Sequence, residues 1–297
     1  MIAVSVDDVG LGLAEHGYLA DQGLATAVFL ALTLHRPLLL EGEAGVGKTE
    51  VAKTLSRWTG GELLRVQCYE GIDVAQAVYE WDYSRQLLHL RAAELRPADA
   101  AAVEDELFSE RFLVRRPLLR AIDHHQPVAP VLLVDEVDRA DDEFEAFLLE
   151  ILSDYSVTVP ELGTFHADVP PVVVITSNRT REIHDALRRR CLYYWIDFPT
   201  LEKEYSIVLA RMPEAPERLA KQVCAFVREL RSADLFKAPG VAETLDWISS
   251  LLALNQMELV EGPVRDTLGA LLKYQDDVLK VGGNEMTRYL KKAQGVS

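Results

Sequence analysis

Cysteine and positive charge are both scarce in this sequence, and their scarcity excludes several classes of protein. The 297 residues include only three cysteines, Cys68, Cys191 and Cys224, which are odd in number and far apart. They provide neither a disulfide framework nor a CxxC-type metal site. The seven histidines lack H-x-x-x-H spacing, and the pair His124-His125 is better explained as a solvated helix end than as a metal site.

The charge balance argues against nucleic acid as the main partner. The chain has 31 basic and 47 acidic residues, which gives a formal net charge of -16. A protein that gains affinity by neutralising phosphates normally carries the opposite balance. We therefore expect no nucleic-acid partner, although a local basic patch is compatible with this composition.

Long hydrophobic runs are also missing. The most apolar stretch near the start, "LATAVFLALTL" (24–34), ends at His35-Arg36-Pro37 and has no basic segment before it. A membrane-spanning helix needs about 20 apolar residues, and a signal peptide needs a basic n-region. We expect a cytoplasmic protein without stable membrane insertion. Hydrophobic residues still make up 49% of the chain, enough to bury a core.

Short apolar runs of strand length recur through the first two thirds of the chain, with helical patterns between them. Most are apolar on both faces, which is typical of strands in a parallel sheet covered by helices. The alternation favours a doubly wound α/β domain. The runs are "PLLLE" (37–41), "ELLRVQ" (62–67), "VLLVD" (131–135), "VVVIT" (172–176) and "LYYWI" (192–196).

The pattern becomes helical from about residue 200, where Pro199 marks the change. We expect an α/β domain over residues 1–199 and a small all-α domain over residues 200–297. The interval between the second and third apolar runs is too long for one crossover. It predicts a helical insertion at about 85–125, including a charged helix over 97–114.

The segment "GEAGVGKT" (42–49) matches the P-loop pattern G-x-x-x-x-G-K-[ST], between a predicted strand and a predicted helix. Its glycines let the backbone curl so that N–H groups face phosphates, and the helix N-terminus adds its positive end. Lys48 is expected to reach the β- and γ-phosphates of ATP, and the Thr49 hydroxyl to bind Mg²⁺. The predicted nucleotide-binding residues are Gly42, Glu43, Ala44, Gly45, Val46, Gly47, Lys48, Thr49 and Glu50.

Polar side chains end the third and fourth predicted strands. In "VLLVDEVD", Asp135 is placed to hold Mg²⁺ through water, and Glu136 to polarise the attacking water as a general base. The second carboxylate argues for hydrolysis rather than for nucleotide binding alone. In "VVVITSNRT", Asn178 is predicted to orient the lytic water or to sense the γ-phosphate; strand-end Ser and Asn also begin turns.

Together these motifs resemble the AAA+ ATPases over residues 15–260. The segment "DEVDRADDEFEAFLLEILSDYSVTV" resembles the MoxR branch, in which a helix leads into a short hairpin before the sensor strand. "GEAGVGKTE", "QCYEGIDVAQAVYEWDYSRQLL" and "PGVAETLDW" are similar to the subgroup associated with carbon monoxide dehydrogenase maturation. The resemblance implies a parallel five-stranded sheet with helices on both faces and a C-terminal all-α lid.

The same resemblance implies function and partners. It indicates a chaperone-like remodelling ATPase that matures a metalloenzyme client. It also implies a ring oligomer, expected to be a hexamer, and a partner with a von Willebrand factor A domain. Lys48, Thr49, Asp135, Glu136 and Asn178 match the family's nucleotide-binding and catalytic positions.

Three adjacent arginines precede the fifth predicted strand. Arg190 lies where the family places the finger that reaches the neighbouring subunit's nucleotide, and Arg188 or Arg189 is also compatible with that role. Arg139 matches the family's Arg after the D-E pair, either as a structural ion pair or in a functional role.

One segment departs from the family pattern, and the role of another has two interpretations. "PGVAETLDW" has Glu243 and Thr244 where the family's lid often offers a sensor Arg. In Tyr69-Glu70-Gly71 a buried tyrosine at a turn is favoured over a pore loop.

Two other functions are compatible with a P-loop. A nucleic-acid-directed motor or loader predicts a continuous basic groove, but acidic and basic residues balance at seven each over residues 85–125. A small-molecule kinase would not need Glu136, and a GTPase should carry an N-K-x-D motif, which the sequence lacks.

Overall fold

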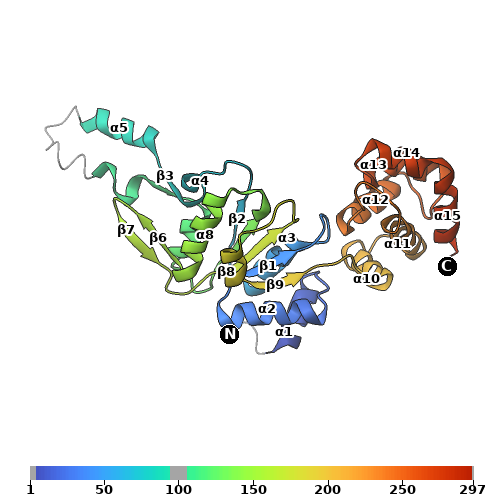
Figure 1. Cartoon of the computed structure of the whole chain (residues 1–297), viewed down its shortest axis with the longest axis horizontal. Helices are drawn as coiled ribbons and strands as arrows, with labels where there is room; N and C mark the ends of the chain where they lie inside the picture. Colours follow the sequence, from blue (N-terminus) through green and yellow to red (C-terminus); the bar gives the residue numbers. More distant parts are fainter. Residues whose placement is uncertain (1–4, 94–105, 296–297) are drawn as a thin grey trace. The chain divides into compact units, whose positions relative to one another are not determined.

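A computed structural model of the chain describes residues 5–93 and 106–295 (Figure 1). The chain divides into two compact units, each described by itself below. The first unit contains residues 1–12, 21–41 and 51–194. The second contains residues 13–20, 42–50 and 195–297. A domain boundary between residues 199 and 200 stays a prediction.

The first unit contains the predicted five-stranded sheet, in the order β2-β5-β8-β1-β9 (Figure 1). The pairings of β2 with β5, β5 with β8 and β8 with β1 are parallel. In this register Gln67 pairs with Asp135, and Glu41 with Ser177. The polar residues that end these strands therefore gather at one edge of the sheet. The strands are β1 (Leu38–Glu41), β2 (Leu63–Gln67), β5 (Val131–Asp135), β8 (Val172–Ser177) and β9 (Leu192–Trp195).

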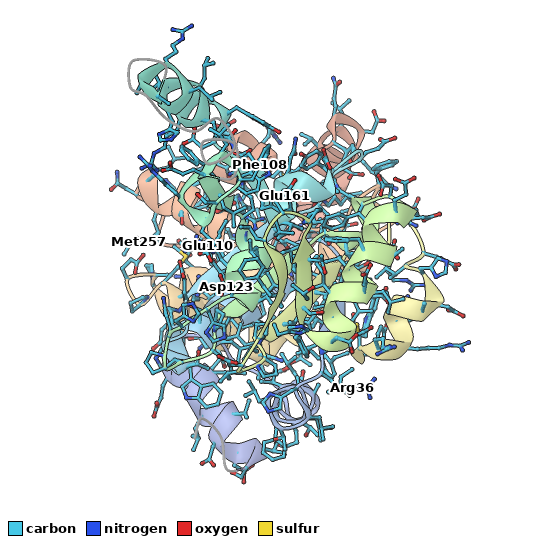
Figure 2. All side chains as sticks on the ribbon, turned by 90° about the vertical axis from the view of Figure 1, so that its left-hand side faces the viewer. Arg36, Phe108, Glu110, Asp123, Glu161 and Met257 are labelled. Carbon is cyan, nitrogen blue, oxygen red and sulfur yellow. The ribbon has the colours of Figure 1, made fainter. Side chains whose placement is uncertain are left out.

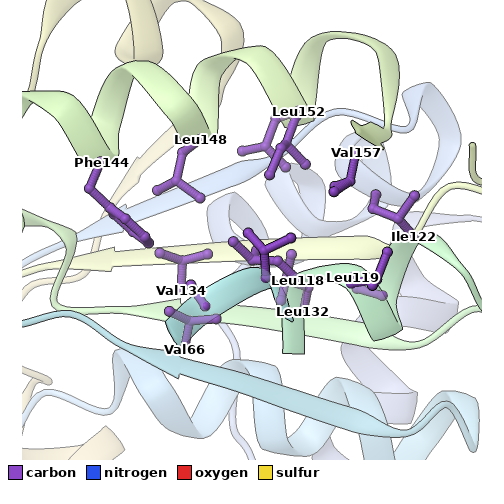
Figure 3. Packing of buried hydrophobic residues seen from close by; sticks show 14 of the residues in the cluster. Val66, Leu118, Leu119, Ile122, Leu132, Val134, Phe144, Leu148, Leu152 and Val157 are labelled. Carbon is purple, nitrogen blue, oxygen red and sulfur yellow. The ribbon is translucent and has the colours of Figure 1, made fainter. Parts of the chain in front are cut away.

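Side-chain alternation along the buried strands gives the sheet two apolar faces. Leu132 and Val134 point to the face covered by α7 (Pro117–Ile122) and α8 (Asp142–Asp154), where Phe144 and Leu148 pack (Figure 3). The opposite face is lined with residues of α2 (Gln22–Leu34) and α3 (Lys48–Thr59). Helices on both faces confirm the predicted α/β fold. On that opposite face Val28, Ala31, Leu32 and Leu55 lie against Leu38, Val172, Val173 and Val174.

The helix–hairpin arrangement implied by the resemblance is present. Helix α8 is followed by the antiparallel strands β6 (Ser156–Val159) and β7 (Gly163–His166), which lead to β8. Asp141 caps α8 by accepting a hydrogen bond from the Phe144 amide at 2.8 Å. The side chains of Phe144, Leu148, Ile151 and Leu152 on this helix are buried in the core.

The predicted helix over 97–114 is wrong at its C-terminal end, and its residues 97–105 lie outside the described part of the chain. The turn η1 (Glu110–Phe112) leads instead into β4 (Leu113–Arg115). Strand β4 pairs antiparallel with β3 (Tyr79–Trp81) and buries Leu113. This contact joins segments distant in sequence, so the local charge pattern did not indicate it. The first unit also contains α4 (Val74–Val78), α5 (Tyr83–Ala93) and most of α1 (Val6–Glu15).

The second unit is helical over residues 196–295, as predicted for the C-terminal region. Its core is built around Phe226 and Trp247, whose ring centroids are 5.2 Å apart. The buried Glu204 carboxylate accepts hydrogen bonds from Arg231 at 2.6 and 2.7 Å. The elements are α10 (Leu201–Arg211), α11 (Glu217–Arg231), α12 (Val241–Ala253), α13 (Glu261–Leu271), α14 (Gln275–Lys280), η3 (Val281–Glu285) and α15 (Met286–Gln294).

In the described ranges 5–93 and 106–295, no helix is both long and apolar enough to cross a membrane.

The three cysteine thiols are buried, which predicts low reactivity in the folded protein. Burial raises the pKa of Cys191 to about 12 and also raises that of Cys224. The pKa of Cys68 rises to about 12 through burial and the nearby Asp135 carboxylate. Because the thiolate is the reactive form, a disulfide reagent at pH 8 should label the native protein slowly. Unfolding in guanidinium should expose all three thiols; rapid labelling without denaturant would contradict their burial.

Candidate active site

The predicted site residues are divided between the two units. The P-loop belongs to the second unit, and the residues at the strand ends and in the arginine run belong to the first.

The P-loop curls around its own lysine. The Nζ of Lys48 donates hydrogen bonds of 2.7 Å to the carbonyl oxygens of Gly42 and Glu43. The loop is left-handed at Gly45 and Gly47, with φ of 80° and 98°, and α3 begins at Lys48. Amide groups at a helix N-terminus and a buried ammonium suit an anion. In the same turn of α3, Glu50 forms an ion pair of 3.1 Å with Arg211.

Gly42 cannot be replaced without a clash. Its φ is 155°, and a Cβ there would lie 2.2 Å from the carbonyl oxygen of Ile196. Gly42→Ala should lower the free energy of unfolding by about 1–3 kcal/mol, the usual cost of a strained backbone residue, and weaken nucleotide binding. Thermal unfolding and nucleotide titration check both effects. Gly269→Ala, in α13 with no atom within 4 Å of the added methyl, is the control. It should leave nucleotide binding unchanged and should not lower the free energy of unfolding, because alanine favours a helix over glycine; equal stability of both variants would contradict the clash.

The N-terminus of α12 lies against the P-loop, inside the second unit. The Val241 amide donates to the Gly45 carbonyl oxygen at 2.9 Å. The two residues that replace a lid arginine have structural partners. Glu243 accepts a hydrogen bond from the Gly240 amide at 3.0 Å, and buried Thr244 donates to Glu204 at 2.8 Å. Glu243 thus caps the start of α12, and Thr244 packs inside the second unit.

In the first unit, both oxygens of the Asp135 carboxylate are engaged. Oδ1 accepts a hydrogen bond from the Thr176 hydroxyl at 2.6 Å. Oδ2 accepts from Arg65 Nε at 3.0 Å and Nη2 at 2.6 Å. The sequence did not single out Arg65 or Thr176 as partners of Asp135.

Glu136 directly follows β5 in a left-handed conformation, with φ 56° and ψ 50°. Non-glycine residues rarely adopt this conformation, and those that do cluster at functional sites. The Glu136 amide donates to the Thr176 hydroxyl at 2.9 Å. Its carboxylate forms a 3.1 Å ion pair with Arg139, and both side chains are partly exposed. The Glu136 carboxylate is thus accessible to water. Arg139 forms an ion pair, one of the two roles considered for it from the sequence.

The turn that carries Asn178 is held by a buried carboxylate. Asp138 accepts hydrogen bonds from the amides of Asn178 at 3.1 Å and Thr180 at 2.8 Å, and from the Thr180 hydroxyl at 2.6 Å. This contact joins the ends of β5 and β8. Sequence reasoning gave Asp138 no role, although its place in the D-E-x-[ND]-R-A segment was a usable signal.

The three adjacent arginines have different surroundings in α9 (Asp185–Arg190). Arg188 donates to Glu41, whose side chain is 2% exposed, at 2.9 Å. Arg189 is 83% exposed and lies 3.5 Å from Asp185. Arg190 is exposed and forms no ion pair with residues 5–93 or 106–295.

Two residues outside the arginine run fix α9. Arg36, labelled in Figure 2, donates to the carbonyl oxygens of Arg189 and Arg190 at 3.0 Å. Before the helix, the buried Glu145 carboxylate accepts a hydrogen bond from the His184 amide at 2.7 Å. Neither contact was predicted from the sequence.

The residues available for a metal suit Mg²⁺. No cluster of three or more histidine, cysteine or acidic side chains able to hold a metal occurs in residues 5–93 and 106–295. Mg²⁺ is usually held by one or two carboxylates together with substrate phosphates. In the first unit, the buried carboxylate of Asp135 is an oxygen ligand of that kind.

The expectation that Tyr69 is buried is wrong. Its side chain is 45% exposed, and its hydroxyl contacts the side chain of Gln76. The tyrosine is held by a polar contact with α4 rather than by burial.

The sheet order and the P-loop define the chain as an α/β P-loop NTPase. The family model for the AAA domain (dynein-related subfamily) matches residues 37–191, more than half of the chain. The chain therefore belongs to this family of AAA+ ATPases.

The fold is similar to that of a protein from Cytophaga hutchinsonii ATCC 33406 that has been provisionally described as an ATPase, at a TM-score of 0.49 and 12% identity. The match covers 98% of this chain and 94% of that one. A comparison with curated protein sequences found no match.

Proposed function

We propose that the chain is a Mg²⁺-dependent ATPase of the MoxR branch that remodels or matures an enzyme client. The observation that carries the hydrolytic part is the Asp135-Glu136 pair at the end of β5, in a chain whose P-loop is closed around Lys48. A nucleotide-holding protein would not need the second carboxylate. The sequence resemblance supports the assignment to the MoxR branch. It also supports a nucleotide-binding domain over residues 1–199 and a lid domain over residues 200–297.

In this proposal Lys48 exchanges its two carbonyl acceptors for the β- and γ-phosphates of ATP. Thr49 and Asp135 would hold Mg²⁺, which when bound neutralises charge that develops on the phosphates. Glu136 accepts the proton of the attacking water. Asn178 orients that water, and Asp138 keeps the Asn178 backbone in place.

Arg190 is proposed to act on the nucleotide of a neighbouring subunit. A guanidinium at the end of a fixed helix, exposed and without an ion-pair partner in the described residues, suits a group supplied in trans. Arg189 is the second candidate for this role. Arg188 is the weakest, because its release would leave buried Glu41 without its partner.

The proposed assembly is a ring, with a hexamer as the expected size, located in the cytoplasm. A partner with a von Willebrand factor A domain and a metalloenzyme client follow from the MoxR resemblance. The test is affinity capture with tagged Glu136→Gln protein in Mg²⁺-ATP, with Lys48→Ala as the control. An enzyme client or partner retained only by the ATP-trapped variant would support the proposal. Nucleic acid as the only retained partner would favour a motor or loader instead.

A further inference from the structure

Arg65 contacts the carboxylate that we expect to serve the metal. It lies on β2, which is paired with the strand β5 that carries Asp135. Its Nε and Nη2 donate to Asp135 Oδ2 at 3.0 and 2.6 Å. With Thr176 on Oδ1, both carboxylate oxygens have donors. A guanidinium therefore lies beside the Asp135 carboxylate in this structure.

The position of Arg65 follows from the sheet. Strand β2 is an edge strand, and its alternation buries Leu64 and Val66 while exposing Arg65 and Gln67. The Arg65 side chain is 49% exposed, whereas that of Asp135 is 4% exposed. Arg65 can therefore move into water by rotating its side chain, but Asp135 cannot.

We propose that Arg65 is a counter-cation for Asp135 that Mg²⁺ must displace. Arg65 therefore raises the Mg²⁺ concentration needed for the nucleotide to bind together with its metal. A buried carboxylate is costly without a cation, and Arg65 meets this need before the metal arrives. A guanidinium and Mg²⁺ beside one carboxylate repel each other. Arg65 is thus a positioning residue, and the inference rests on the proposed function.

A matched arginine in the same unit allows the charge effect to be separated from a general surface effect. Arg120, on α7, is 45% exposed and pairs with Glu62, which is itself 41% exposed. Its exposure is close to that of Arg65, but its partner is a solvated carboxylate rather than Asp135. Removal of Arg120 changes the protein's net charge as removal of Arg65 does, without touching the proposed metal ligand.

The experiment compares Arg65→Met, Arg65→Lys, Arg120→Met and the full-length wild-type chain. Binding of a fluorescent, non-hydrolysable ATP analogue is measured against free Mg²⁺, and Mn²⁺ paramagnetic resonance with the same analogue counts bound metal. Arg65→Met should lower the Mg²⁺ midpoint about tenfold, the equivalent of about 1.4 kcal/mol for a lost charged hydrogen bond. Arg65→Lys should lie between it and wild type. Arg120→Met and binding in EDTA should not change.

The outcomes separate this inference from the proposed function. An unchanged midpoint in Arg65→Met, with wild-type protein binding the analogue, would overturn the inference alone. A raised Mg²⁺ midpoint in Arg65→Met would also overturn the inference, because Arg65 would then favour metal binding at Asp135 rather than compete with it. Failure of wild type to bind the analogue better than Lys48→Ala would sink both. If Arg65→Met does not fold, Arg65→Gln provides the same test with one amide donor kept.

Discussion

Replacement of Glu136 by glutamine is expected to lower turnover by orders of magnitude while leaving ATP affinity nearly unchanged. The amide keeps the size of the side chain and the left-handed turn after β5 but cannot accept the water proton. General bases contribute about 10²–10⁴-fold to rate, so phosphate release should fall by that factor. Equilibrium binding of ATP and release of phosphate, measured on the same preparation, check the two halves of this prediction.

The control for this substitution is Glu143→Gln on the exposed surface of α8, which removes the same charge a few residues away. It should leave turnover unchanged. Normal turnover in Glu136→Gln would show that Glu136 is not the base, and loss of ATP binding would show a structural role instead.

Arg190→Ala should lose about 10³–10⁵-fold in kcat, as expected for an arginine finger, and should still bind ATP. Because the finger acts in trans, mixing this variant with Lys48→Ala subunits should restore part of the activity. An intact Arg190 from one subunit would then face an intact P-loop in another. Phosphate release is measured across mixing ratios, with each variant alone as reference.

Arg188→Ala separates a structural arginine from a finger. It should lower the unfolding temperature, because buried Glu41 loses its 2.9 Å partner. Arg189→Ala, whose side chain is 83% exposed, should not. If mixing Arg190→Ala with Lys48→Ala subunits restores no activity at any ratio, Arg190 does not act in trans. If activity is restored only when Arg189→Ala is mixed with Lys48→Ala, the arginine finger is Arg189.

Much of the first unit could be predicted because the relevant information is local. Strands buried on both faces show as short apolar runs, and all five runs became strands of the sheet. The P-loop, which belongs to the second unit, could be predicted for the same reason, since its glycines, its lysine and the start of α3 lie within a few residues.

The contacts that the sequence did not reveal join residues far apart along the chain. Arg65 and Asp135 are separated by 70 positions, and Asp138 and the Asn178 amide by 40. No periodicity or spacing rule pairs such residues, because sheet order decides which strand ends become neighbours. The β3–β4 pairing was missed for the same reason, since charged residues hide its short apolar segments.

The most direct test of ATP hydrolysis by this chain is phosphate release per subunit, measured with Mg²⁺-ATP over a wide range of protein concentration. The specific activity should rise steeply with concentration as subunits assemble and arginine fingers meet neighbouring nucleotides. It should stay at background in Lys48→Ala at every concentration. A wild-type specific activity no greater than that of Lys48→Ala would contradict the assignment of this chain as an ATPase.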